Sequence, residues 1–291
     1  MRDQDSLRYL FIVNPKAGKG RFKHLIPYIK KEFPQNIPYD IVISQFPGEA
    51  REMMQKRLNE YDVFVSAGGD GTVNEVSGEL INTGKHLGMI AIGSGNGLAR
   101  ELGIPLNYKR ALRVLQKARP RIIDSVRINS RTFINMAGVG FDATIARRFE
   151  GFGKRGICPY IRIIPQSLVS YKPQNYEIII DGRQIFRTAY MVSIANTTQF
   201  GGGAHICPPA KPDDGILNIV ILNPFRYNRI PGMAYSLFTG RIERSKALEI
   251  YSCKKIFIKG DNLCTHIDGE PVELGDELEI SIIPQSISVL C

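Results

Sequence analysis

The chain has 291 residues, of which 43% are hydrophobic and 23% charged, and this composition excludes disordered and fibrous proteins. Its length predicts two domains, each large enough to bury its own core. No apolar run approaches the ~18 residues of a membrane-spanning helix. Five cysteines without a CxxC pair argue against a disulfide framework or a cysteine zinc site, and they favour a reduced, cytoplasmic protein.

The formal net charge of +10 is concentrated in one stretch of the chain. Residues 107–162 carry 13 basic and 3 acidic side chains, so the remainder is neutral. Such a segment predicts an anionic partner, which could be nucleic acid, a membrane surface or a phosphorylated ligand. Composition does not choose among these three.

The first half alternates short apolar runs with segments of helical period. The apolar runs predict strands at Tyr9–Val13, Tyr39–Ile43, Asp62–Ser66 and Gly88–Ile92. The helical segments lie at Phe22–Ile29, Ala50–Leu58, Val73–Leu80 and Tyr108–Ala118. Pro27 indicates that the first helix begins near His24 or is kinked. The spacing leaves room for crossover helices, so we expect an α/β domain with a doubly wound, mostly parallel sheet and ligands beyond the carboxyl ends of its strands.

The second half contains many short strand-like runs and little helical period. We expect strands at Thr132–Ala137, Tyr176–Ile180, Gln184–Arg187, Tyr190–Ala195, Ile216–Leu222, Lys255–Lys259, Leu263–Ile267 and Glu277–Ile283. Asp181-Gly182 predicts a type I′ hairpin turn. The pattern indicates an all-β antiparallel sandwich or barrel. Two segments do not fit this strand pattern, Ala143–Lys172 and Phe225–Ile242.

These patterns predict a domain at residues 1–122 and a second at 123–283. It stays open whether a C-terminal strand at 284–291 joins the first domain.

Glycine-rich loops follow three of the four predicted N-terminal strands. They are Asn14–Gly20, Gly68–Thr72 and Gly93–Gly97, and all should emerge at one edge of the sheet. Glycines let backbone amides approach an oxygen-rich ligand, and helix N-termini favour negative charge. Asp70 would repel a phosphate unless a divalent cation lies between them or the carboxylate receives a proton.

Other common phosphate-binding motifs do not match. The first loop lacks the GxxxxGK[ST] spacing of a P-loop, and no loop reads GxGxxG. Asp268-Gly269-Glu270 on its own reads as a hairpin turn. Pro209–Ile216, with its paired aspartates, reads as a cation loop or a solvated turn.

Taken together, these motifs resemble the diacylglycerol kinase catalytic family, which includes bacterial soluble lipid kinases and sphingosine kinases. The resemblance runs in order along nearly the whole chain through Asn14–Gly20, Gly68–Glu75, Gly93–Asn96, Asp124, Gly140–Asp142, Gly201–Gly203, Asp213–Gly215 and Asp268–Glu270. NAD kinases share the Gly-Gly-Asp-Gly loop, but this chain lacks the Thr-Pro-Thr-Gly-Ser-Thr-Ala-Tyr type segment that they carry downstream.

The resemblance implies ATP and Mg²⁺ as cofactors and a role for individual residues. The nucleotide would contact Asn14, Ser44, Gly68, Gly69, Asp70, Gly71, Thr72, Val73, Asn74, Ser94, Gly95 and Asn96. Glu270 would accept the proton of the lipid hydroxyl, with Asp70 as the other candidate base. Asp70 and Asp124 would join the Mg²⁺ network at the phosphates. Asp214 and the carbonyls of Lys211 and Ile216 would hold a second, structural Mg²⁺.

One loop departs from the bacterial diacylglycerol kinase pattern. Gly93-Ser94-Gly95-Asn96-Gly97 lacks the second Asp of Gly-Thr-x-Asn-Asp and looks like the sphingosine kinase loop. The acceptor is therefore open between diacylglycerol and a sphingoid-base class of lipid. Asp142 would pair with a substrate ammonium, or it serves as a turn or cap residue.

The sequence thus predicts an ATP- and Mg²⁺-dependent lipid kinase, cytoplasmic and peripheral at an anionic membrane surface, with no nucleic-acid partner. A kinase for NAD or another soluble nucleotide and a non-catalytic anion-binding protein are the alternatives. A homodimer stays open. Lys154 or Arg155 could reach the transferred phosphate. Ile157–Ile164 and Phe225–Phe238 are candidates either for a lipid-tail cleft or for ordinary core.

Overall fold

The computed structural model describes residues 7–150, 164 and 167–291. The chain divides into two compact units, one formed by Met1–Ile123 with Gln285–Cys291 and the other by Asp124–Pro284. Lys154, Arg155 and most of the apolar run from Ile157 lie outside the described residues.

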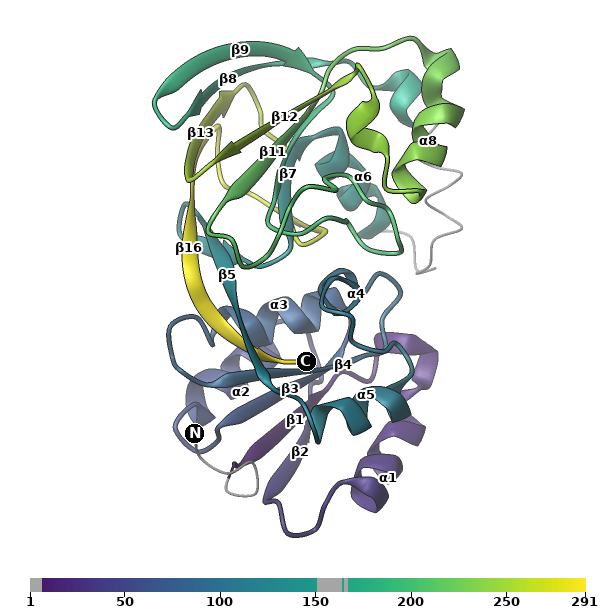
Figure 1. The fold of residues 1–291 in the computed structure, drawn as a ribbon, viewed down its shortest axis with the longest axis vertical. Coiled ribbons are helices and arrows are strands. Elements are labelled where there is room, and N and C mark those ends of the chain that lie inside the picture. Colours follow the sequence, from purple (N-terminus) through teal and green to yellow (C-terminus); the bar gives the residue numbers. More distant parts are fainter. Residues whose placement is uncertain (1–6, 151–163, 165–166) are drawn as a thin grey trace. The chain divides into compact units, whose positions relative to one another are not determined.

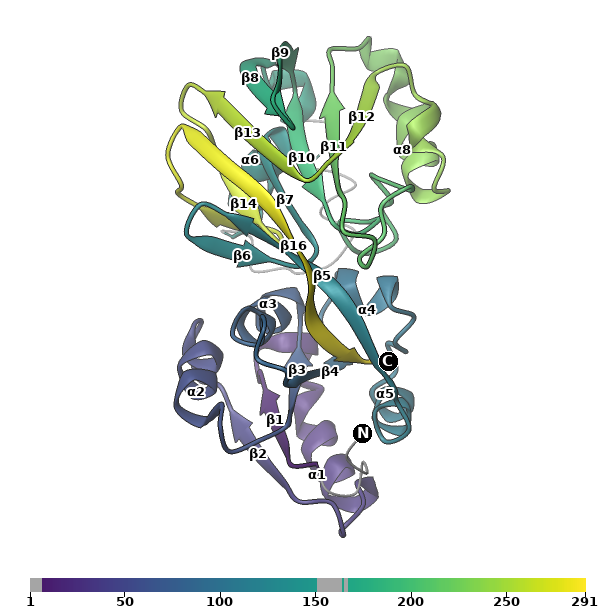
Figure 2. The ribbon, with the colours of Figure 1, turned by 60° about the vertical axis from the view of Figure 1, so that its left-hand side comes forward.

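The first unit is built on four parallel strands in the order β2-β1-β3-β4 (Figure 1). They are β1 (Tyr9–Val13), β2 (Tyr39–Ile43), β3 (Val63–Gly68) and β4 (His86–Ala91). The helices are α1 (Phe22–Glu32), α2 (Glu49–Arg57), α3 (Asp70–Gly78), α4 (Gly97–Glu101) and α5 (Tyr108–Leu115), with a 3-10 turn η2 (Ala17–Gly20). Side chains of α1 and α5 pack with β1 and β3 in one core, whereas α2 and α3 lie on the other side of the sheet (Figure 2). This is the doubly wound arrangement that the sequence predicts.

The first helix differs from its prediction. It begins at Phe22 and includes Pro27 in its interior. Proline in a helix removes the amide hydrogen bond to the carbonyl one turn earlier, and its ring crowds that carbonyl. Burial of Leu25 and Ile29 in the core holds the helix in place despite that loss.

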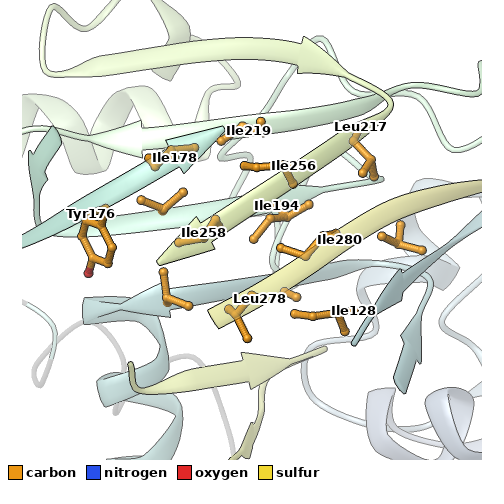
Figure 3. Packing of buried hydrophobic residues seen from close by; sticks show 14 of the residues in the cluster. Ile128, Tyr176, Ile178, Ile194, Leu217, Ile219, Ile256, Ile258, Leu278 and Ile280 are labelled. Carbon is orange, nitrogen blue, oxygen red and sulfur yellow. The ribbon is translucent and has the colours of Figure 1, made fainter. Parts of the chain in front are cut away.

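The second unit contains antiparallel sheets around an apolar core. One sheet has the order β12-β11-β10-β7-β14-β15. Its strands are β7 (Met136–Gly140), β10 (Met191–Ala195), β11 (Leu217–Leu222), β12 (Leu248–Cys253), β14 (Thr265–Ile267) and β15 (Glu270–Val272). Opposite lie β5 (Pro120–Ile128), β6 (Arg131–Phe133), β8 (Gln174–Ile180), β9 (Arg183–Ala189), β13 (Lys255–Gly260) and β16 (Glu277–Leu290). Branched side chains of both layers, such as Ile194, Ile219, Ile256 and Ile280, fill the interior (Figure 3).

The long strand β16 belongs to both units. Its first residues pair antiparallel with β13, and Ser288 and Val289 pair in parallel with β4. Pro284 and Gln285, whose φ is 50°, lie between the two paired stretches, and each stretch has its own ladder of hydrogen bonds.

The hairpin prediction at Asp181-Gly182 is confirmed, since both residues have the positive φ of a type I′ turn, 45° and 87°. The sequence did not predict the short helix α4 of the first unit, nor α6 (Phe141–Glu150) and α8 (Ile230–Phe238), which lie largely in the two segments that did not fit the strand pattern. Short 3-10 turns η3 (Tyr227–Arg229) and η4 (Ile242–Arg244) flank α8. A helix with apolar residues on every side, such as α8, gives no amphipathic period to detect.

Among the described residues, no helix is both long and apolar enough to cross a membrane.

Candidate active site

The glycine-rich loops of the first unit meet at the carboxyl edge of its sheet. A Cβ added to Gly93 would lie only 2.6 Å from the Cα of Gly69, and one on Gly18 would lie 2.5 Å from the carbonyl oxygen of Ile92. Contacts this close leave no room for a side chain. The loops after β1, β3 and β4 therefore lie at one edge, as the sequence predicts, and these glycines are required because the loops pack backbone against backbone.

Asp70 connects two of these loops. Its carboxylate accepts hydrogen bonds from the backbone amides of Asn96, at 2.8 Å, and Gly97, at 2.7 Å. A Cβ on Gly95 would lie 2.6 Å from Asp70 Oδ2, so this position also needs glycine. Burial raises the pKa of Asp70, and the two amides oppose that rise. With both oxygens engaged, Asp70 holds the Gly93–Gly97 loop against α3.

Asn14 ties the first loop to the same helix. Its Nδ2 donates to Thr72 Oγ1 at 3.0 Å, and its Oδ1 accepts from the amide of Lys16 at 2.9 Å. The amide of Ser44, which is buried, donates to the carbonyl of Val13 at 3.0 Å. The predicted nucleotide residues from Asn14, Ser44, Gly68–Asn74 and Ser94–Asn96 thus belong to one group of loops at one sheet edge.

Asn96 carries an unused acceptor at this edge. Its backbone is left-handed, with φ 53°, and its Nδ2 donates to the carbonyl of Gly93 at 2.9 Å. Its Oδ1 is buried and has no hydrogen-bond donor in the described part of the chain. A buried acceptor without a donor is costly, so a donor from a ligand would satisfy it.

In the second unit, Asp124 organises the loop that contains Lys211–Ile216. Its backbone amide donates to the carbonyl of Pro212 at 2.6 Å, and its Oδ2 accepts from the amide of Gly215 at 2.7 Å. Asn196 Nδ2 donates to its carbonyl at 3.1 Å. Asp124 therefore holds the loop of the expected structural Mg²⁺ through Pro212 and Gly215.

The same loop offers oxygen ligands of the kind that Mg²⁺ prefers. Asp214 is exposed and uses Oδ1 to accept the amide of Ile216 at 3.0 Å. Its second oxygen and the carbonyls of Lys211 and Ile216 are the ligands that the sequence predicts for this ion. Among the described residues there is no group of three His, Cys, Asp or Glu side chains able to hold a metal. Backbone carbonyls would therefore supply most protein ligands here.

The Asp268-Gly269-Glu270 segment forms a tight hairpin turn between β14 and β15. Asp268 and Gly269 have φ of 49° and 84°. Asp268 Oδ1 accepts the amides of Asn135 and Met136 at 3.1 and 2.9 Å, and its own amide donates to the carbonyl of Met136 at 2.7 Å. The turn that carries Glu270 is therefore fixed to the segment that begins β7, while Glu270 itself is exposed.

A buried polar cluster lies behind this turn. Asp142 lies at the start of α6. Its Oδ1 accepts a hydrogen bond from the backbone amide of Ala143 at 2.8 Å, and its Oδ2 accepts one from the Ser193 hydroxyl at 2.5 Å. His266 Nε2 lies 3.2 Å from the same Oδ2, and His266 Nδ1 accepts the amide of Gly269 at 3.3 Å. The His266 ring thus stands between Asp142 and the turn of Glu270, although its Nε2–H is not aimed well at the carboxylate.

This cluster is tightly packed. A Cβ on Gly138 would lie 2.2 Å from Asp142 Oδ2. Burial raises the pKa of Tyr171 to about 12, and the charge of Asp142 adds to the rise. Burial also raises the pKa of Tyr176, to which Tyr171 and Asp142 contribute. Asp142 is therefore an anchor inside the unit, which favours its reading as a cap residue over a contact with a substrate ammonium.

Sequence reasoning missed Ser193, His266 and Glu75 as members of these groups. Glu75 Oε1 accepts the amide of Gly48 at 2.9 Å and so fixes the loop after β2. Because Glu75 belongs to the Gly68–Glu75 motif, its role in the site could have been predicted from the sequence. Ser193 and His266 carried no signal, because only strand pairing brings β10 and β14 to either side of β7.

The basic segment does not form a single element. Exposed bases lie on α5 of the first unit, at Lys109, Arg110 and Arg113, and on β5, β6 and α6 in the second, at Arg127, Arg131, Arg147 and Arg148. The charge that the sequence concentrates in one stretch is thus shared by both units.

Family models match both parts of the chain. The diacylglycerol kinase catalytic domain matches residues 8–128, and the YegS C-terminal NAD kinase beta sandwich-like domain matches residues 135–291.

Curated relatives match over almost the full length. A protein of Yersinia enterocolitica named probable lipid kinase YegS-like is 27% identical over 287 residues, covering 96% of this chain and 95% of its own. A protein of Pectobacterium atrosepticum with the same name is 26% identical, covering 96% and 94%.

Solved structures share the fold. A candidate diacylglycerol kinase of Bacillus anthracis superposes with a TM-score of 0.82 at 24% identity, covering 97% of this chain and 96% of that one. A second Bacillus anthracis structure described as a diacylglycerol kinase gives a TM-score of 0.76 at 22% identity, with the same coverage. With matched models over both units and relatives over the full length, the chain belongs to the diacylglycerol kinase catalytic family of lipid kinases.

Proposed function

We propose that this protein transfers the γ-phosphoryl group of ATP, with Mg²⁺, to the hydroxyl of a membrane lipid alcohol. The observation that carries the proposal is the group of glycine loops at one sheet edge, held together by Asp70 and Asn14. Phosphoryl transfer depends mainly on positioning and charge neutralisation, and rigid backbone amides supply both.

The first unit would bind the nucleotide. The N-terminus of α3 presents backbone amides of Gly71 and Thr72 without a capping side chain, which suits phosphate oxygens. The buried Oδ1 of Asn96 would accept a hydrogen bond from an amino or hydroxyl group of ATP. Ser94 and Gly95 would line the same edge.

Mg²⁺ would neutralise phosphate charge during transfer. On this chain, Asp214 with the carbonyls of Lys211 and Ile216 would hold a structural ion, and Asp124 would fix the loop that presents those carbonyls. Asp70 would act on the nucleotide loop as a positioning residue rather than as the base, because its oxygens already accept two amides.

Glu270 would accept the proton of the lipid hydroxyl. A carboxylate base needs to reach the hydroxyl within hydrogen-bond distance, so its backbone must be held firmly. Asp268 provides that support through the amides of Asn135 and Met136. The Gly93–Asn96 loop, similar to that of sphingosine kinases, leaves both diacylglycerol and sphingoid-base acceptors as candidates.

The test incubates the purified chain with labelled ATP, Mg²⁺ and a total lipid extract, with NAD as a separate acceptor. We expect a phosphorylated lipid, no labelled NAD product, and loss of labelling in Glu270→Gln with unchanged folding. The matched control is Glu273→Gln, an exposed carboxylate three residues away, which should keep full activity. Full activity of Glu270→Gln would refute the assignment of the base, and labelled NAD without labelled lipid would refute the acceptor.

A further inference from the structure

Helix α8 is apolar on more than one side, and the described residues of the second unit cover only one of these sides. Its sequence, Ile-Pro-Gly-Met-Ala-Tyr-Ser-Leu-Phe, contains no charged residue. Ile230, Met233 and Leu237 pack against the neighbouring apolar core, and the amide of His205 donates to the carbonyl of Leu237 at 3.0 Å. The helix is therefore docked firmly, beside β12 at the rim of this unit (Figures 1 and 2).

The opposite side of α8 exposes large apolar groups. Pro231, Ala234, Tyr235 and Phe238 follow the i, i+3, i+4, i+7 spacing of one helical face. Tyr235 is 68% exposed and Phe238 46%. Tyr227, 44% exposed, and Val169, 57% exposed, adjoin each other through a 3.4 Å hydrogen bond from the Tyr227 hydroxyl to the Val169 carbonyl. Exposed aromatic groups on one helical face, such as Tyr235 and Phe238, are typical of an interaction surface.

Positive charge borders this face. Residues 225–242 contain Arg226, Arg229 and Arg241 and no acidic residue, and all three arginines are exposed. Tyrosine and phenylalanine flanked by arginine suit the boundary between the headgroups and acyl chains of an anionic bilayer. At nine residues, α8 is too short to cross a bilayer but long enough to lie in its surface.

We propose that the α8 face, defined as Tyr227, Tyr235 and Phe238 with Arg226, Arg229 and Arg241, docks the protein on an anionic phospholipid membrane. The aromatic groups enter the interface and the arginines contact lipid phosphates. The inference deepens the proposed function, since a kinase for membrane lipids works at this surface. It differs from the prediction for Phe225–Phe238, because Phe225 and Met233 pack on the core while Tyr235 and Phe238 are exposed.

Vesicle sedimentation of the full chain tests the proposal. The probes are phosphatidylcholine vesicles with about one third phosphatidylglycerol, compared with pure phosphatidylcholine. We expect Tyr235→Ser with Phe238→Ser to lower vesicle binding at least tenfold. Phe186→Ser, which removes an aromatic that is 66% exposed on β9, is the matched control and should bind as the parent does.

Two triple variants distinguish an effect of these particular arginines from an effect of the protein's net charge. Replacing Arg226, Arg229 and Arg241 with Gln should abolish the preference for anionic vesicles. Replacing Arg131, Arg183 and Lys254, which are exposed on other parts of the second unit, removes the same charge and should leave the preference intact. Equal losses in the two triple variants, or parent-like binding of the aromatic double variant, would overturn the docking surface.

Two further measurements keep this inference distinct from the proposed function. The aromatic double variant should phosphorylate a short-chain, water-dispersed lipid alcohol as fast as the parent, and loss of that activity would show that α8 acts in the site instead. If the unsubstituted protein binds anionic vesicles but shows no kinase activity, the docking surface is supported and only the proposed function is refuted. If the double variant forms smaller species than the parent and still binds vesicles as the parent does, α8 serves self-association and the proposal is overturned.

Discussion

The carboxylate of Asp70 lies 2.7 Å from the backbone amide of Gly97, so that the loop after β4 is held by the first residue of α3. An acidic residue in a glycine-rich loop suggests a metal ligand or a base when read alone. Here its negative charge is used to fix backbone amides from a second loop.

The first prediction concerns this link. Asp70→Asn keeps the shape but places an NH₂ group against a backbone amide, so we expect ATP affinity to fall by about 1–3 kcal/mol, or roughly 5- to 150-fold. Calorimetric titration with ATP measures it. Asp62→Asn changes a half-buried carboxylate that lies just before β3 and pairs with Lys85; it is the control and should leave ATP affinity unchanged. Unchanged affinity in Asp70→Asn would contradict the positioning role.

The second prediction concerns the Glu270 turn. Asp268→Ala removes the acceptor for the amides of Asn135 and Met136 and places alanine at φ 49°, whereas Asp268→Asn keeps an acceptor oxygen and tolerates that φ. We expect kcat to fall about tenfold or more in Asp268→Ala and less in Asp268→Asn, with ATP affinity equal in both. Steady-state kinetics with a lipid acceptor decides this, and equal kcat values for the two variants would exclude turn positioning.

The third prediction concerns the packing behind the turn. In Gly138→Ala the new methyl group would lie 2.2 Å from Asp142 Oδ2 and 3.1 Å from His266 Nε2. We expect the free energy of unfolding to fall by about 1–3 kcal/mol, the usual cost of overpacking. Gly232→Ala, where nothing lies within 4 Å of the new Cβ, should be neutral or stabilising. Urea unfolding measures the free energy of unfolding of both variants. Equal values would show that the side chains around Asp142 can move to accept the added methyl group.

The fourth prediction concerns pH. Glu249 on β12 accepts a bidentate contact from Arg187 on β9, at 3.0 and 3.1 Å from Nε, so the pair links the two sheet layers of the second unit. The Arg187 hydrogen bond, with those from Tyr251 and Asn223, lowers the pKa of Glu249 from 4.5 to about 2.

Because the folded pKa is depressed, this stabilisation is present above pH 4.5 and is lost as pH falls through about 2. With both side chains about one third exposed, we expect about 1–2 kcal/mol. The unfolding free energy of Glu249→Gln should therefore lie below that of the parent near neutral pH and converge with it in acid. Glu279→Gln, which loses an exposed pair with Lys255, should show a smaller difference. A constant gap across the pH range would rule out the charge as its cause.

The fifth prediction concerns the Lys211–Ile216 loop. Mg²⁺ bound through Asp214 should raise the melting temperature, since a ligand of the folded state stabilises it. A chelator should reverse this shift, and Asp214→Asn should remove most of it. Asp213→Asn, the neighbouring carboxylate, is the control. Identical Mg²⁺ responses in the parent and Asp214→Asn would place the ion elsewhere.

The sequence determined much of the first unit and the chemistry of the loops. Continuous apolar runs spaced for crossover helices specify parallel strands, and parallel strands bring their following loops to one edge. The grouping of Asn14, Asp70 and Asn96 could therefore be predicted. The Asp181-Gly182 turn was equally readable, because its φ values are a local demand.

Tertiary structure alone decided what the acidic residues contact. Asp124 meets the loop of Gly215, and Asp142 meets Ser193 and His266, across 91, 51 and 124 positions of chain. No local pattern encodes such pairs, since they depend on which strands become neighbours. Helix α8 is a further example. The sequence left Phe225–Phe238 open between a lipid-tail cleft and ordinary core, and only the packing of the described residues shows that Tyr235 and Phe238 are exposed. The charge excess likewise reads as a single basic segment, but the fold divides it between two units because the chain passes from one to the other within that segment.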